Sequence, residues 1–79
     1  MAFAESENEW AERVARHLKA ELKRADVTYE ELALRLRQHG FEETKASITN
    51  KLSRATSSVH FFLASLAAIG RYTLRIEDI

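Results

Sequence analysis

The chain has 79 residues, with no cysteine and no proline, and its 12 basic and 12 acidic side chains cancel. This length leaves room for a single domain, residues 1–79, that buries roughly 60% of its unfolded surface. Without cysteine, disulfides and thiolate metal sites are excluded, so apolar side chains or a partner subunit must stabilise the fold. A net charge of zero argues against indiscriminate coating of nucleic acid, which requires many phosphates to be neutralised.

The amino terminus, residues 1–5, lacks the basic start and the apolar stretch of a secretory signal. No segment approaches the roughly 18 consecutive apolar residues that a membrane-spanning helix needs. The sequence therefore predicts a cytoplasmic protein with no membrane partner.

Two helices are predicted in the first half of the chain. Ser6 and Glu9 fit a capping box, and apolar residues then recur every four positions from Trp10 to Leu22, which predicts a helix over about 7–25. A second capping box, beginning at Thr28, opens a shorter helix whose inward side chains are Leu32, Ala33 and Leu36. Gly40 is expected to end this helix, because glycine readily takes the left-handed conformation.

A third helix is predicted to begin after Thr44, which can cap it. Ile48 and Leu52 lie four positions apart and are expected to face the core, while the Phe41 side chain packs back beneath the helices. The remaining side chains of this helix leave a polar outer surface: Lys45, Ser47, Thr49, Asn50, Lys51 and Arg54.

The last third of the chain predicts one helix and one extended segment. Ser57 or Ser58 begins a helix over 59–69 that is apolar on almost every side, and such a helix is expected to be buried. Trp10, Phe61 and Phe62 are expected in the core. Gly70 ends the helix, and residues 71–77 alternate polar with apolar at the period of a half-buried strand.

A lone strand cannot satisfy its own backbone, so two arrangements are open for residues 71–77. The segment either packs as an extended arm or pairs with its copy in a second subunit as a two-stranded ribbon. We favour the pairing, which makes the protein a homodimer through its C-terminal segment. The expected fold class is thus an all-α, compact four-helix bundle with a short C-terminal β-strand or arm.

Positive charge lies in two blocks. Residues 13–24 carry five bases against one acid, and residues 44–54 carry Lys45, Lys51 and Arg54 with no acid. Two interpretations of the first block are open: contact with phosphates, or pairing with nearby glutamates. The block consists of Arg13, Arg16, Lys19, Lys23 and Arg24, and the glutamates are Glu9, Glu12 and Glu21.

The polar face of the third helix has the side chains that a major-groove reader needs. The groove is about 12 Å wide and admits one helix, in which asparagine bonds adenine and arginine or lysine bonds guanine. The N-terminal half of such a helix reaches deepest, so its side chains are candidates for base edges: Lys45, Ser47, Thr49 and Asn50. The candidates for contacts with the DNA backbone are Lys51, Ser53 and Arg54. Thr44, at the start of the helix, is a further candidate for contact with DNA.

The run Tyr29-Glu30-Glu31-Leu32-Ala33, followed by Ser47-Ile48-Thr49-Asn50-Lys51-Leu52-Ser53-Arg54, resembles the helix-turn-helix of the lambda-repressor or Cro-like (XRE-type) class. Ala33 matches the small alanine of that class, and Ile48 its apolar residue in the recognition helix. The resemblance covers about Thr28 to Gly70, with the helix-turn-helix core at about 28–54 and a longer turn than is usual. The order of motifs also resembles a small bacterial domain family of uncharacterised function.

This resemblance implies a bacterial transcriptional regulator that binds duplex DNA in a sequence-specific way. The alternative is a protein-interaction adaptor or antitoxin-like partner that keeps the helix-turn-helix shape without binding DNA, which the neutral charge and longer turn favour. No nucleophile elbow or phosphate loop is present, and the three histidines lack metal-ligand spacing. We therefore expect no enzyme activity, small-molecule substrate, cofactor or metal.

Overall fold

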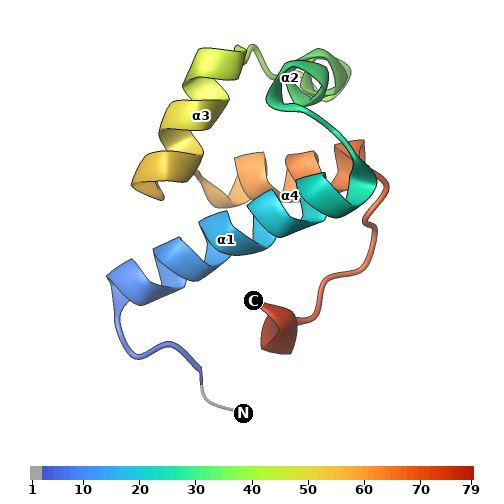
Figure 1. Ribbon diagram of the computed structural model, residues 1–79. Helices are drawn as coiled ribbons and strands as arrows, with labels where there is room; N and C mark the ends of the chain where they lie inside the picture. The colour runs from blue at the N-terminus through green and yellow to red at the C-terminus, as the bar shows by residue number, and fades with distance from the viewer. Residues whose placement is uncertain (1–2) are drawn as a thin grey trace.

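The computed structural model of the chain describes residues 3–79 and contains four α-helices in this range. They are α1 (Glu7–Ala25), α2 (Tyr29–Arg37), α3 (Lys45–Arg54) and α4 (Val59–Ala68), followed by a single turn of 3₁₀ helix, η1 (Ile76–Asp78). Figure 1 shows α2 and α3 on one side of α1, with the C-terminal segment on the opposite side. The expected compact all-helical architecture is confirmed.

Each helix begins where a hydroxyl side chain can cap it. Ser6, Thr28, Thr44 and Ser58 each accept a hydrogen bond from the backbone amide three residues later. Such a cap satisfies one of the amides left free at a helix start and contributes about 1 kcal/mol. The predicted starts of all four helices are therefore confirmed, with Ser58 rather than Ser57 as the cap of α4.

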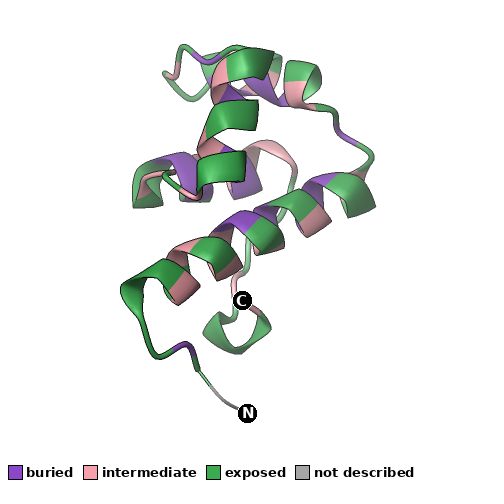
Figure 2. Ribbon diagram, turned by 60° about the vertical axis from the view of Figure 1, so that its left-hand side comes forward, coloured by how far each residue is buried: buried purple, intermediate pink, exposed green. Residues whose placement is uncertain are grey.

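The core lies where the four helices meet, and Figure 2 shows the buried stripes facing one another. Leu18, Leu32, Leu36 and Ile48 are completely buried, and Phe61 is 1% exposed. Because these side chains come from all four helices, the helices are positioned by one shared apolar cluster. Phe41 packs against this cluster and lies edge-on to Phe61, as its position in the sequence predicted.

Two predictions about burial are wrong. Trp10 is 37% exposed, because it lies at the outer end of the apolar stripe of α1, where its ring stacks on Phe3. Helix α4 is not buried all round: Val59 is 73% and Leu63 is 49% exposed. One face of α4 packs on α1 and α2, and its other face is apolar but uncovered.

The predicted C-terminal strand is also wrong for the described residues, which contain no strand. The structure shows the other arrangement left open for this segment, an arm: residues 71–75 are irregular and fold back on α1. Leu74 and Ile79 pack against the core cluster, and Arg71 forms an ion pair with Glu21 at 2.6 Å. Intramolecular packing on α1 thus replaces the ladder of hydrogen bonds that a strand needs.

Within residues 3–79, none of the helices combines the length and the apolar character needed to cross a lipid bilayer.

Candidate nucleic-acid interface

Helix α3 is fixed in orientation by its cap and by its two buried side chains. Thr44 and Ser47 form a reciprocal capping box, in which each side chain accepts a hydrogen bond from the other residue's backbone amide. Ile48 is completely buried and Leu52 is 2% exposed, both in the core cluster. Since the buried side of α3 is set by these two residues, the opposite side must face solvent.

The exposed side of α3 carries polar side chains over its whole length. Its exposed polar residues are Lys45, Thr49, Asn50, Ser53 and Arg54. No acid lies between Thr44 and Arg54 in the sequence. We call these five residues the outer face of α3.

The outer face retains free hydrogen-bonding groups. The hydroxyl of Thr49 donates to the Lys45 carbonyl at 2.8 Å, and that of Ser53 donates to the Asn50 carbonyl at 3.2 Å, so both can still accept a bond. Within residues 3–79, the side chains of Asn50 and Arg54 have no hydrogen-bond or ion-pair partner. Their amide and guanidinium groups are therefore available to a ligand.

Lys45 is held only weakly. Its ammonium nitrogen lies 3.7 Å from a carboxylate oxygen of Glu30 in α2, and both side chains are about two-thirds exposed or more, at 66% and 73%. Exposed pairs of this kind contribute about 0–1 kcal/mol, so the lysine can exchange Glu30 for another anion at little cost.

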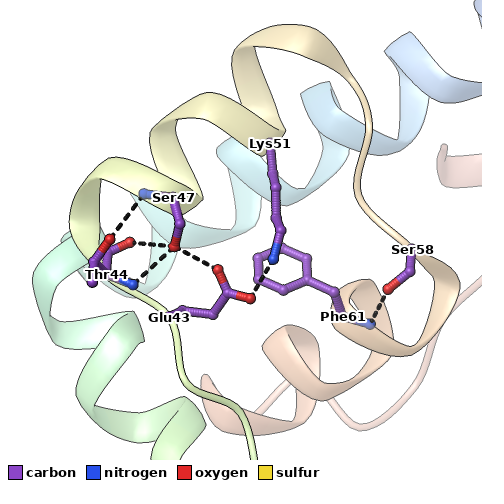
Figure 3. Close-up of polar contacts among 6 residues, drawn as sticks. All are labelled: Glu43, Thr44, Ser47, Lys51, Ser58 and Phe61. Carbon is purple, nitrogen blue, oxygen red and sulfur yellow. Dashed lines mark hydrogen bonds and ion pairs between the residues drawn. The ribbon is translucent and has the colours of Figure 1, made fainter.

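Ser47 and Lys51, which helical periodicity predicts on the DNA-facing surface, are instead engaged with a buried acid. Figure 3 shows the carboxylate of Glu43 between them: one oxygen accepts a hydrogen bond from Ser47 Oγ at 2.6 Å, and the other pairs with Lys51 Nζ. The Glu43 side chain is 6% exposed and that of Lys51 34%. The charge of Lys51 is thus neutralised inside the protein.

The Lys51 ammonium also lies 4.9 Å from the centroid of the Phe61 ring, within the range of a cation–π contact. Glu43 belongs to the connection before α3, Lys51 to α3 and Phe61 to α4 (Figure 3). The group therefore links three segments and fixes α3 relative to the connection. Sequence patterns did not reveal it, because an acid in a loop is ordinarily at the surface.

Two of the α1 cations pair with glutamates of the same helix. Arg13 lies 3.5 Å from Glu9, and Arg24 lies 2.5 Å from Glu21, which also binds Arg71. Pairing, one of the two interpretations left open by the sequence, is the one observed for these two arginines.

Two of the three histidines lie against aromatic rings. His17 lies edge-on to Phe62, and His60 stacks on Phe41, at ring-centroid distances of 6.1 and 6.2 Å. Across residues 3–79, no three histidine, aspartate or glutamate side chains are grouped in a way that could hold a metal ion.

Comparison with known proteins identifies the family of the chain but no individual relative. No curated protein and no solved structure matches it significantly. A family model described as "Domain of unknown function (DUF6471)" matches residues 10–74. This span runs from α1 through all four helices to the arm that folds back on α1. The chain therefore belongs to the DUF6471 family of domains of unknown function.

Proposed function

We propose that this protein binds duplex DNA in a sequence-specific manner, with α3 as a recognition helix in the major groove. The observation that carries the proposal is the outer face of α3, which is acid-free, exposed and rigidly oriented by Ile48 and Leu52. A helix of this kind fits the groove, whose width of about 12 Å matches the diameter of a helix with its side chains.

Within this proposal, Asn50 is the principal base-reading residue. Its amide is exposed and unpartnered within the described chain, and asparagine can bond the N6 and N7 edge of adenine bidentately. Lys45 and Thr49 lie beside it as further base-edge contacts, while Ser53 and Arg54 contact the DNA backbone. Ser47 and Lys51, being bonded to Glu43, have a positioning role rather than a direct one.

Helices α2 and α3 would form the helix-turn-helix of the lambda-repressor-like type. Ala33 of α2 is 7% exposed and packs in the same cluster as Ile48, in support of this arrangement. The connection between the helices is longer than in that class, and the Glu43 contacts to Ser47 and Lys51 hold its end against α3.

A regulator of this kind gains affinity when two copies bind adjacent half-sites. The homodimer therefore remains part of the proposal. Because residues 71–75 form no strand, the C-terminal segment would contribute exposed apolar side chains, Tyr72 and Ile76, rather than a paired ribbon. Sedimentation of the full chain and of a chain ending at Gly70 tests this: a dimer that survives the shortening excludes the segment as the interface.

The second candidate function is a protein-interaction adaptor, favoured by one observation. An apolar groove runs between α1 and the start of α4, lined by Trp10, Val14, Val59 and Phe62. Trp10 and Val59 are exposed in the described structure and would be covered by a partner.

Retardation of duplex DNA separates the two functions. A random-sequence duplex titrated with the protein at low salt should be retarded, and the retardation should weaken steeply as salt is added, because counterions compete for the phosphates. Absence of retardation at every protein concentration would favour the adaptor over the DNA-binding protein.

A further inference from the structure

The cations of α1 fall on two different flanks of the helix. One flank faces the C-terminal segment: Arg13, His17 and Arg24 line a groove there together with Asp78 and Ile79. Arg16 lies at the boundary between the flanks, because it lines this groove as well as the one beside α3. Arg13 and Arg24 are paired with glutamates on this side, as described above. Both arginines already pair with a glutamate, and neither lines the groove between α1 and α3.

The other flank carries Arg16, Lys19 and Lys23, which we call the α1 cation row. Spacings of three and four residues place these side chains on one face of a helix. All three are exposed, and none of them forms an ion pair or hydrogen bond within residues 3–79. In a chain whose net charge is zero, the row is thus a local concentration of uncompensated positive charge.

The α1 cation row adjoins the outer face of α3. Arg16 and Lys19 line a shallow surface groove whose opposite wall includes Ser53 of α3. Glu12 lies at the N-terminal end of this groove, one turn before Arg16, and makes no ion pair with it among the described contacts. Arg54, also unpaired within the described residues, follows Ser53 and is a further exposed cation at the end of α3. Figure 1 shows the C-terminal segment on the opposite side of α1 from α3.

We propose that the α1 cation row binds the phosphodiester backbone that borders the groove read by α3. This inference rests on the proposed function and identifies a second element of the interface. The axes of packed helices lie about 8–10 Å apart, whereas the edge of the major groove is about 6 Å from its centre. When α3 lies in the centre of the groove, a helix packed beside it therefore lies above the sugar-phosphate backbone at the groove edge. The long side chains of arginine and lysine can reach the phosphates from there.

The length of the row also fits this ligand. From Arg16 to Lys23 it extends about 10 Å along α1, at 1.5 Å for each residue. Each DNA strand carries one negative charge for roughly 3.4 Å of helix axis, so the row faces more than one phosphate. Such contacts carry no sequence information, and they set the register and orientation of α3 in the groove.

The test measures how strongly binding depends on salt. Affinity for a fluorescent mixed-sequence duplex is determined between 50 and 200 mM KCl for the natural chain and for the triple variant Arg16→Gln, Lys19→Gln, Lys23→Gln. Each phosphate contact contributes about 0.9 to the slope of log affinity against log salt. The triple variant should therefore lose about 2.7 from the slope, and each single variant about 0.9.

The matched control removes three cations from the opposite flank: Arg13→Gln, Arg24→Gln and Arg75→Gln. Arg24 and Arg75 line a groove beside the C-terminal segment, and Arg13 lies on the same side of α1. This variant has the same net charge as the first and should keep the natural slope. Thermal melts followed by circular dichroism identify any variant that has lost its fold. If a triple variant is unfolded, the salt slopes of the single variants test the inference instead.

Four outcomes separate the two proposals. A reduced slope in the row variants alone supports the inference. Equal slopes in all three proteins, with the natural chain binding DNA, overturn the inference and leave the proposed function standing. No binding by the natural chain overturns both. An equal loss in both triple variants shows a general effect of charge and also overturns the role of the row.

Discussion

Glu43 and Lys51 form an ion pair that ties the connection before α3 to the second turn of that helix. The pair is asymmetric, because the carboxylate is 6% exposed and the lysine side chain 34%. Ser47 donates a further hydrogen bond to the same carboxylate. A loop acid is thus part of the packed interior, and it determines which side chains of α3 remain available at the surface.

Replacing Glu43 with glutamine should destabilise the fold. The variant keeps an acceptor for Ser47 but loses the charge that compensates Lys51, whose ammonium can move into solvent because the side chain is one-third exposed. We expect a loss of about 1–2 kcal/mol, below the 3–5 kcal/mol typical of a fully buried pair. Urea unfolding measures it, with Glu42→Gln as the matched control, since Glu42 is exposed. Equal unfolding midpoints for the two variants would show that the pair contributes nothing.

Two serines, one within α4 and one that caps it, should respond in opposite directions to replacement by alanine. Ser65 is completely buried, and its hydroxyl has no hydrogen-bond partner in the described part of the chain. Removing this hydroxyl should raise the free energy of unfolding by about 1 kcal/mol, because its desolvation is uncompensated. Ser58 caps α4 through the amide of Phe61, so Ser58→Ala should lower it by about 1 kcal/mol. Thermal melts of both variants test the contrast, and a destabilised Ser65→Ala variant would contradict it.

The C-terminal arm should contribute to stability through Leu74 but not through its exposed neighbours. Leu74 packs against the core cluster, whereas Tyr72 is 82% exposed. Leu74→Ala is expected to lower the free energy of unfolding by about 1–2 kcal/mol, less than at a fully buried leucine. Tyr72→Ala should change it by less than about 0.5 kcal/mol. If both variants melt like the natural chain, the arm does not pack on α1 in solution.

The helices could be predicted from the sequence because local signals agree with tertiary packing. A hydroxyl residue stands at each helix start, and the apolar residues that follow are spaced to meet in one core, as Leu18 and Ile48 do. The arm could not be predicted in the same way. Its alternation of polar and apolar residues is compatible with a strand. In the fold, however, the apolar residue Leu74 is partly buried by packing on the core, and no partner strand is present among residues 3–79.

The position of the candidate site in the chain could be predicted from the sequence, but not all of the residues that form it. The polar residues of α3 and the inward placement of Ile48 and Leu52 follow from helical periodicity. The periodicity does not indicate that Lys51 pairs with Glu43, because that contact joins residues eight positions apart across a loop and a helix. Which flank of α1 each cation occupies likewise depends on the three-dimensional positions of α3 and the C-terminal segment, although the Arg13–Glu9 and Arg24–Glu21 pairs lie within α1 itself.

The central claim is that the outer face of α3 reads DNA sequence. Duplexes selected from a random pool by the natural chain provide the target, and the double variant Asn50→Ala, Arg54→Ala provides the test. Both side chains are exposed and unpartnered within the described residues, so the thermal melt of this variant should be nearly unchanged. Loss of Asn50 should cost about 1–3 kcal/mol of discrimination at one base position. We predict that the variant loses its preference for the selected duplex over a scrambled one, and an unchanged preference would contradict the account.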